Sequence, residues 1–214
     1  MSRYITRDYK TYNTIIKDCP IILKKTRILF DKETNLIILQ IAINNLSSKE
    51  IKKINFTITT YNLENEIIDK EKTIVIEEKI KQNSEYSIKK PIIFKSKNIN
   101  YINVTIKEVI YTDNLIWHNT KNKLEKEINK PNIIYTNSDL YKTLCFNKIK
   151  FNKLCYPEFN DNYWRCSCKT LNIYSESNCK LCNTQKKELE NFFEYSKIEN
   201  LVSEYKQQCI EKKE

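Results

Sequence analysis

The 214-residue sequence predicts a mainly β protein: an antiparallel β-sandwich, a four-cysteine ribbon and a short α-helical C-terminal tail. Three observations support this class. Short β-branched segments recur through residues 21–117, four cysteines fall within residues 166–182, and helical periodicity follows them. We expect the following parts: a sandwich at 15–120, a connector with short helices at 121–160, a ribbon at 161–186 and a tail at 187–214.

The β region consists of segments rich in β-branched and aromatic residues, separated by polar turn clusters. They are IILKKTRILF, NLIILQIAI, INFTITTY, KTIVIEE, SIKKPIIF and INVTIKEVIY. Alternation from Ile54 to Thr59 predicts one buried and one solvent-facing side, and six or seven such strands favour an antiparallel sandwich. Because the chain has no glycine, Asn35 and Asn65 are expected at left-handed turn positions. Pro91 is expected at a strand edge or bulge.

Composition limits the possible functions. A chain without glycine cannot form the glycine-rich loops that bind nucleotide phosphates. The net charge of +10 predicts a weak attraction to polyanions. No apolar run reaches the roughly 20 residues of a membrane span, and the start lacks an apolar signal-peptide core. We therefore expect no transmembrane segment and a cytoplasmic location, where thiols stay reduced and clustered cysteines favour metal over disulfides.

The four clustered cysteines have the spacing Cys166-x-Cys168, ten residues, Cys179-x2-Cys182. Tetrahedral zinc takes thiolates at about 2.3 Å, and two closely spaced pairs on tight turns can reach one ion from opposite sides. Four sulfur ligands leave no position for water, so a single Zn²⁺ here is expected to be structural. The alternatives are two disulfides or four free thiols, and a Cys-x-Cys disulfide would close a small strained ring.

The residues around the cysteines resemble the zinc fingers of the nuclear-pore Ran-binding type. Trp164 and Asn172 stand at the positions of that pattern, W-x-C and x3-N-x6-C-x2-C, although the first cysteine pair has a shorter spacer. The resemblance implies that Trp164 packs beside the metal and that the Asn172 side chain ties two crossed hairpins together. Lys169 and Thr170 replace the Thr-Phe of ubiquitin-binding members. The loop 173–178 lacks the arginines of RNA-binding members.

Two further resemblances concern the larger organisation. The segment IAINNLSSKEIKKINFTITTYNLENEII, residues 41–68, resembles the hairpin of FxLYD-type Ig-like domains of bacteria. The order of β-rich domain, connector, cysteine ribbon and helical tail is similar to an uncharacterised family of zinc-ribbon proteins from Gram-positive bacteria. These resemblances imply an Ig-like sandwich and a structural zinc site, with no known activity. Family members usually have glycine after the second ligand, where this chain has Lys169.

Helical segments are predicted in the connector and in the tail. A short helix is expected from Leu124 to Ile128, and Ser138 is expected to cap a second one, DLYKTLCFN. After the ribbon, the apolar spacing predicts two helices with a break near Tyr195. Residues 196–199 match a capping box for the second of them.

The leading functional prediction is a non-enzymatic zinc-binding protein that mediates protein–protein interactions with an unknown partner. The alternative is nucleic-acid binding, because residues 141–156 interleave lysines with aromatics and contain no acid. A solvated connector whose aromatics pack inward would give the same pattern. The candidate nucleic-acid contacts are Lys142, Lys148, Lys150 and Lys153.

No catalytic residues are predicted. His118 is the only histidine and has no paired Ser or Cys signature, so a surface or hydrogen-bonded structural role is expected. The remaining cysteines lack ligand spacing and are expected to be small buried hydrophobes, although a second weak metal site involving Cys145 and Cys155 is an alternative. These remaining cysteines are Cys19, Cys145, Cys155 and Cys209.

Overall fold

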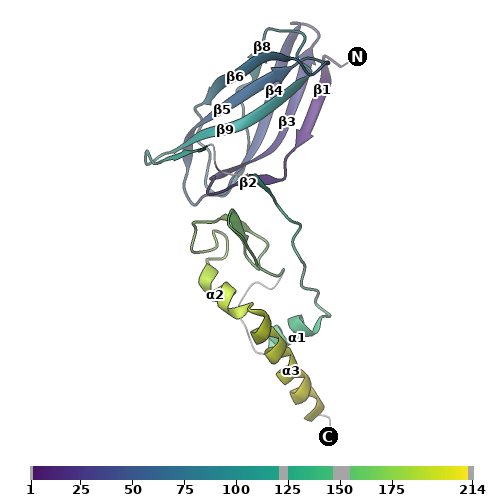
Figure 1. Cartoon of the computed structure of the whole chain (residues 1–214), viewed down its shortest axis with the longest axis vertical. Helices are drawn as coiled ribbons and strands as arrows, with labels where there is room; N and C mark the ends of the chain where they lie inside the picture. Colours follow the sequence, from purple (N-terminus) through teal and green to yellow (C-terminus); the bar gives the residue numbers. More distant parts are fainter. Residues whose placement is uncertain (1, 121–124, 147–154, 212–214) are drawn as a thin grey trace. The chain divides into compact units, whose positions relative to one another are not determined.

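A computed structural model describes residues 2–120, 125–146 and 155–211. The chain divides into two compact units, Met1–Glu127 and Ile128–Glu214. The first unit is built from antiparallel strands, and the second contains a small sheet and the helices (Figure 1). None of the helices in the described part of the chain has the length and hydrophobicity needed to cross a lipid bilayer.

The first unit contains two large antiparallel sheets and one small strand pair. The five-stranded sheet consists of β1 (Tyr4–Thr11), β3 (Ile21–Asp31), β4 (Leu36–Asn45), β7 (Glu85–Ser87) and β8 (Ile92–Phe94), and both β7 and β8 pair with β4. The four-stranded sheet has the order β10 (Ile116–His118), β9 (Tyr101–Tyr111), β5 (Ile51–Tyr61), β6 (Ile67–Ile76). The small pair is β2 (Thr14–Ile16) with β11 (Glu125–Glu127).

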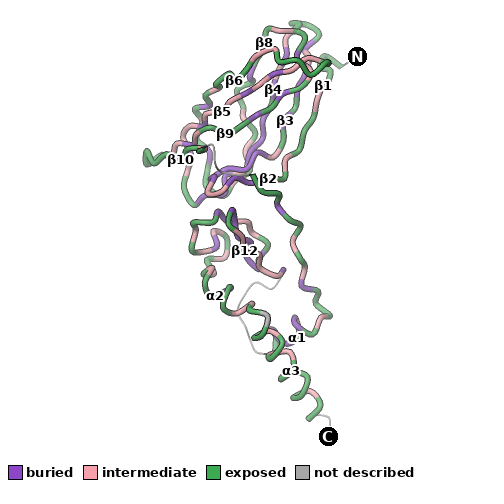
Figure 2. Tube along the Cα trace, in the orientation of Figure 1, coloured by how far each residue is buried: buried purple, intermediate pink, exposed green. Residues whose placement is uncertain are grey.

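Both large sheets contribute side chains to one hydrophobic core. Figure 1 shows β5, β6 and β9 as one layer and β3 and β4 in the other, and Figure 2 shows buried positions alternating along these strands. In β5 the side chains of Ile54, Phe56 and Ile58 are fully buried while the residues between them are partly exposed. The predicted alternation from Ile54 to Thr59 is therefore confirmed.

Asparagine takes five of the eight left-handed backbone positions in the described residues of this glycine-free chain. Asn35 has φ 56° in the β3–β4 turn, and Asn65 has φ 63° in the β5–β6 turn, as predicted. In the first of these turns the Asn35 N–H donates to the carbonyl of Asp31 at 2.8 Å. Pro91 lies directly before the short strand β8. Local turn chemistry thus sets the ends of the long strands.

The first unit differs from the sequence prediction at both of its ends. Strand β1 begins at Tyr4, ahead of the predicted start at residue 15, and pairs with β3 along its length. The predicted helix from Leu124 to Ile128 is wrong in its described part, because Glu125–Glu127 form strand β11. Pairing with β2 satisfies backbone groups that a three-residue helical segment would leave open. The predicted connector 121–160 is consequently divided between the two units.

The described residues of the second unit form a three-stranded antiparallel sheet and three helices. The strands are β12 (Glu158–Phe159), β13 (Tyr163–Arg165) and β14 (Leu171–Ile173), and the helices are α1 (Asp139–Phe146), α2 (Lys186–Phe192) and α3 (Tyr195–Glu211). Ser138 caps α1 as predicted, because its Oγ accepts the Tyr141 N–H at 3.2 Å. The two predicted tail helices are also present. The predicted capping box at 196–199 is wrong, since α3 begins earlier, with the Glu194 carbonyl accepting its first N–H groups.

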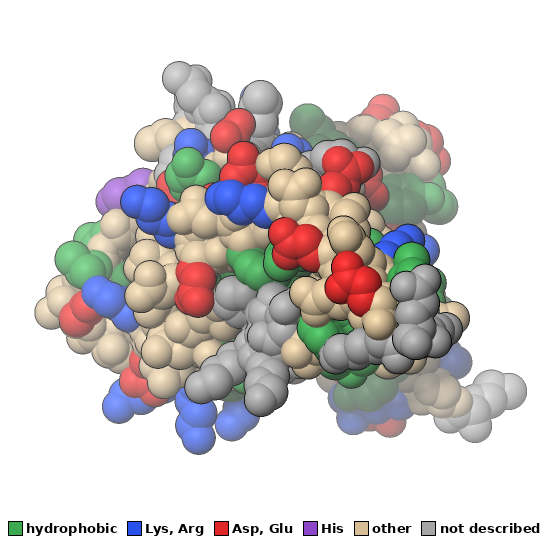
Figure 3. Space-filling view, turned by 90° about the horizontal axis from the view of Figure 1, so that it is seen from below, with side chains coloured by type: hydrophobic (Ala, Val, Ile, Leu, Met, Phe, Trp, Pro, Cys, Tyr) green, Lys and Arg blue, Asp and Glu red, His purple; other side chains and the backbone are tan. Residues whose placement is uncertain are grey.

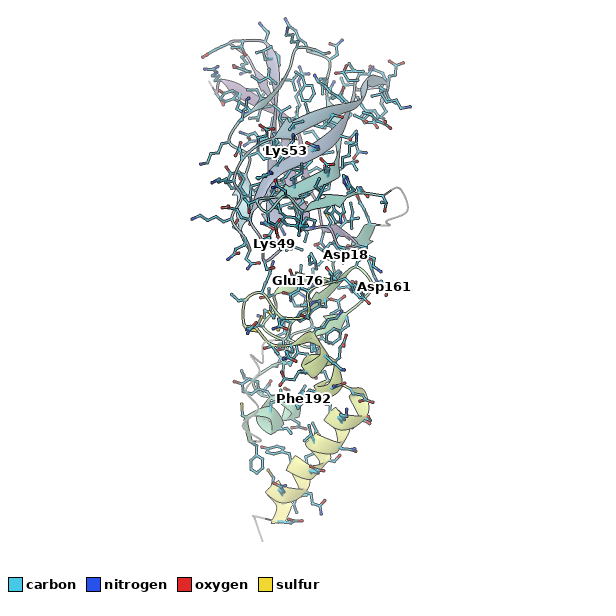
Figure 4. All side chains as sticks on the ribbon, turned by 90° about the vertical axis from the view of Figure 1, so that its left-hand side faces the viewer. Asp18, Lys49, Lys53, Asp161, Glu176 and Phe192 are labelled. Carbon is cyan, nitrogen blue, oxygen red and sulfur yellow. The ribbon has the colours of Figure 1, made fainter. Side chains whose placement is uncertain are left out.

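The helices share a small apolar cluster of their own. Leu140 and Leu144 of α1 are buried against Ile198 and Val202 of α3. Phe192, labelled in Figure 4, belongs to the same cluster at the end of α2. The cluster therefore joins the predicted connector helix to the C-terminal helix.

Candidate metal centre

Four cysteine side chains converge in the second unit, at the end of β13 and in the turn before α2. Their Sγ atoms all lie within 4.8 Å of one another. The Sγ atoms of Cys166 and Cys182 are 3.5 Å apart, and those of Cys168 and Cys179 are 3.6 Å apart. A tetrahedron with metal–sulfur distances of about 2.3 Å has sulfur–sulfur distances of about 3.8 Å. The cysteines are thus close enough to hold one metal ion between them.

The first cysteine turn is closed by backbone hydrogen bonds. The Cys166 N–H donates to the Thr170 carbonyl at 2.9 Å, and the Lys169 N–H donates to the Cys166 carbonyl at 2.9 Å. Lys169 has φ 72°, a left-handed conformation that a residue with a Cβ adopts at a cost. The Thr170 hydroxyl lies 3.1 Å from the Cys168 Sγ, where it can donate to a thiolate.

The second cysteine turn repeats the first. The Cys179 N–H donates to the Thr184 carbonyl at 2.8 Å, and the Asn183 N–H donates to the Cys179 carbonyl at 2.8 Å. Asn183 has φ 59°, so each pair is followed by one left-handed residue. The Thr184 hydroxyl lies 3.2 Å from the Cys182 Sγ. Each pair therefore has its own threonine, two residues after the second cysteine, whose hydroxyl lies within hydrogen-bond distance of a sulfur.

Asn172 connects the two cysteine turns. Its fully buried side chain donates from Nδ2 to the Thr170 carbonyl at 3.2 Å, and its Oδ1 accepts the Lys180 N–H at 3.0 Å. These bonds reach one residue of each turn. Asn172 thus ties the two cysteine turns together.

Trp164 packs beside the cysteines. Its side chain is fully buried in a cluster with Cys166, Cys168 and Leu189 of α2, and its ring stacks on Phe159 at an interplanar angle of 18°. The indole Nε1 donates to the Glu176 carbonyl at 2.8 Å, so this polar group is satisfied inside the protein. The ring is not available as an exposed stacking surface.

A buried polar network supports the strand that leads to the first cysteine. Arg165 is only 4% exposed, and its Nη2 donates to the Asn129 carbonyl at 2.6 Å. Its Nε lies 3.5 Å from the Glu158 carboxylate, which also accepts the Tyr163 hydroxyl at 2.6 Å. Burial, and then this hydrogen bond, raise the pKa of Tyr163. The sequence analysis did not identify this network. The one available signal was Arg165 itself, because arginine is rare in this lysine-rich chain and occurs at only four positions.

The clustered thiols shift one another's pKa values. Hydrogen bonds with Cys168 and Cys179, together with burial, raise the pKa of Cys166. Hydrogen bonds donated by Cys166 and Cys168 lower the pKa of Cys179. The protons are thus shared among neighbouring sulfurs, and a metal ion that binds four thiolates must displace them.

The other cysteines do not join this cluster. Cys155 is fully buried, and its thiol donates to the Cys166 carbonyl at 3.4 Å; burial raises its pKa. Cys19 is buried in the core of the first unit, as predicted, and Cys209 is partly buried. Cys145 is exposed on α1, so the prediction of a buried hydrophobe is wrong there. Within the described residues, the four clustered cysteines are the one candidate metal-binding group.

The candidate nucleic-acid contacts are only partly described. Lys142 is exposed on α1, whereas Lys148, Lys150 and Lys153 lie outside the described residues. Two aromatics of this segment pack inward: Tyr141 and Tyr156 join the apolar cluster of the helices. On the face shown in Figure 3, acidic and basic side chains are interspersed.

His118, the only histidine, is exposed on β10. Its Nδ1 lies 3.0 Å from the Glu108 carboxylate of the neighbouring strand. This contact is the surface hydrogen-bonded role expected for it.

Comparisons with known proteins do not show a family for this chain. No family model matches it, and no curated protein matches it. A crystal structure of a DUF1425 family member from Shewanella sp. pv-4 is similar over 47% of this chain and 94% of its own, with 8% sequence identity and a TM-score of 0.35. At that level of similarity, the match identifies neither a shared fold nor a shared function.

Proposed function

We propose that this chain is a non-enzymatic cytoplasmic protein that holds one structural Zn²⁺ on Cys166, Cys168, Cys179 and Cys182 and mediates protein–protein interactions. The observation that carries the proposal is the cluster of four sulfurs, all within 4.8 Å of one another, with separations of 3.5 and 3.6 Å in two of its pairs. Four soft thiolates in a tetrahedral arrangement are the ligand set that zinc prefers. A threonine hydroxyl beside one sulfur of each pair supports bound thiolates.

A structural role follows from the ligand set. All four tetrahedral positions would be taken by protein sulfur, so no position is left for a reacting water or substrate. Cys166, Cys168 and Cys179 are buried, and Trp164 and Leu189 pack against them. Zinc would then supply much of the folding free energy of this part of the chain.

The interaction role is supported by an apolar side chain that the metal site presents to solvent. Leu181 lies between the ligands Cys179 and Cys182 and is 72% exposed. Its backbone is held by the second cysteine turn, so a partner could bind it with little loss of conformational entropy. The first unit, which we propose to be an Ig-like sandwich, has two sheets around one core and resembles modules with adhesive or structural roles.

Metal analysis tests the zinc site. We expect about one zinc ion per chain by elemental analysis of freshly purified protein, and loss of that zinc in Cys166→Ser. The matched control is Cys145→Ser, which changes an exposed cysteine outside the cluster and should leave the zinc content unchanged. Stoichiometric iron in place of zinc, or disulfides among the four cysteines, would contradict the proposal.

A pair of leucine variants tests the interaction role. Leu181→Ser should keep its zinc and abolish capture of a protein partner, whereas Leu63→Ser, also exposed at 65% but in the first unit, should not. If both variants captured the partner equally well, the second cysteine turn would not be part of the binding surface. Retention on single-stranded DNA that falls steeply with salt would favour the nucleic-acid alternative instead.

A further inference from the structure

The outward face of the five-stranded sheet contains a hollow of about 280 Å³. Two rows of paired residues form it. Tyr9, Arg27 and Gln40 lie side by side across β1, β3 and β4. Lys25, Ala42 and Ser87 lie side by side in the next row, across β3, β4 and β7. The hollow lies in the first unit and is separate from the cysteine cluster.

Ala42 forms the floor of this hollow. It is the only alanine in a chain that has no glycine, so it is the smallest side chain available. Its neighbours Ile41 and Ile43 point into the core, which places Ala42 on the opposite, outward face. Lys25 and Ser87 flank it in register with longer side chains. One short side chain between longer ones creates the depression.

The side chains around the hollow carry positive charge without compensation. Lys25 and Arg27 both line it, and no acidic side chain does. In the described part of the chain, neither forms an ion pair. Two cations on one small concave surface attract an anion from solution.

Arg27 differs from the other arginines in its contacts. The chain uses arginine at only four of its 37 basic positions. Arg3 pairs with Asp31, and Arg7 donates to two backbone carbonyls. Arg165 is buried with Glu158. Among the described residues, Arg27 donates only to the hydroxyl of Thr6 and has no carboxylate or carbonyl partner of the kind that the other arginines have.

The contact with Thr6 orients the guanidinium of Arg27. Nε and Nη2 both donate to Thr6 Oγ1, at 3.1 and 2.8 Å. This leaves the Nη1 donors for a ligand. An arginine that is already oriented loses less conformational entropy when it binds an anion.

We propose that this hollow binds the phosphate monoester of a small compound with a planar ring, such as a nucleoside monophosphate. A phosphate monoester is nearly dianionic at neutral pH and matches the two charges of Lys25 and Arg27. The hollow has the volume of roughly nine bulk waters, more than a phosphate alone requires. The planar ring of the bound compound would lie beside Tyr9, whose side chain is 55% exposed. Gln40 and Ser87 would supply polar contacts to it.

Titration of the full-length zinc-loaded protein with adenosine 5′-monophosphate tests the proposal. We expect saturable binding by calorimetry or NMR, stronger than that of inorganic phosphate or adenosine, and weakened at high salt. Lys25→Gln and Arg27→Gln should each weaken it about tenfold, the effect of losing one charge-assisted contact. Lys107→Gln is the matched control, because it removes an exposed charge from the four-stranded sheet.

A second variant tests the shape of the hollow without changing charge. Ala42→Val should fill the floor and abolish binding, while thermal unfolding shows that the sheet remains folded. Absence of saturable binding, or equal weakening by Arg27→Gln and Lys107→Gln, would overturn the proposal. Binding of single-stranded DNA but not of the mononucleotide would also overturn it, in favour of a diffuse polyanion surface. None of these results depends on the zinc content, so failure here is distinguishable from failure of the zinc proposal.

Discussion

At the scale of single residues, the cysteine turns show how the absence of glycine produces backbone strain. Each turn needs a left-handed residue after its second cysteine, and the chain supplies Lys169 in one and Asn183 in the other. Asparagine tolerates this conformation better than other residues with a side chain, whereas lysine has no such advantage. The first turn is therefore the more strained of the two.

Lys169→Gly should stabilise the zinc-loaded protein by about 0.5–1 kcal/mol, because glycine removes the steric cost of the left-handed conformation and only part of that gain is lost to the unfolded chain. The measurement is the urea midpoint of the second unit. Glu190→Gly, at an exposed position in the middle of α2, should instead destabilise by about 1 kcal/mol. Equal destabilisation by both changes would show that φ at residue 169 is not a source of strain.

At the scale of elements, an ion pair between Arg3 and Asp31 connects the start of β1 to the end of β3. Arg3 Nη2 lies 2.6 Å from the carboxylate of Asp31, whose side chain is 2% exposed. The same carboxylate accepts the Thr34 hydroxyl at 2.8 Å in the β3–β4 turn. The hydrogen bond from Arg3, and then that from Thr34, hold the pKa of Asp31 well below its usual range.

Because folding lowers the pKa of Asp31, this ion pair should make the first unit less stable at acidic pH. A carboxyl whose pKa is lowered by folding stabilises the fold above its ordinary value of about 3.9 and loses this contribution as the pH falls below it. Asp31→Asn should therefore lower the urea midpoint of the first unit at pH 7, and the difference from wild type should shrink at pH 3. A difference that stays constant across this range would show that the ion pair contributes nothing.

The alternating strands and the spaced cysteines were predictable at this scale because their patterns are local. Ile54, Phe56 and Ile58 alternate with polar residues, and that alone determines which side of β5 is buried. Strands β1 and β11 were not predicted. Their short, charged sequences carry no apolar pattern, and they form strands because the edges of β3 and β2 offer hydrogen-bond partners.

At the scale of the whole molecule, the two units depend on different sources of stability. The first buries a large apolar core from two sheets, so we expect it to fold without a ligand. The part of the second unit around the four cysteines buries a much smaller apolar set. The metal is therefore expected to stabilise one unit and not the other.

If the four cysteines hold a metal, its removal should selectively unfold the sheet and turns around them. With a strong chelator, backbone amides of β13, β14 and the two cysteine turns should lose hydrogen-exchange protection, while those of β3, β4, β5 and β9 keep theirs. The same treatment of Cys166→Ser should change little, because its site is already impaired. Loss of protection in both units together would show that the first unit also depends on the metal.

The sequence by itself determined the mainly β class, the asparagine turns, the two tail helices and the four cysteines that converge, since each is encoded in residues close together along the chain. Only the tertiary structure decided the partners of those elements. The threonine hydroxyls beside the sulfurs, the Arg165–Glu158 contact and the hollow over Ala42 depend on turn geometry, on strand register or on residues from separate segments. Such contacts form when a core or a hydrogen-bonded network places the segments side by side, and no local pattern specifies them.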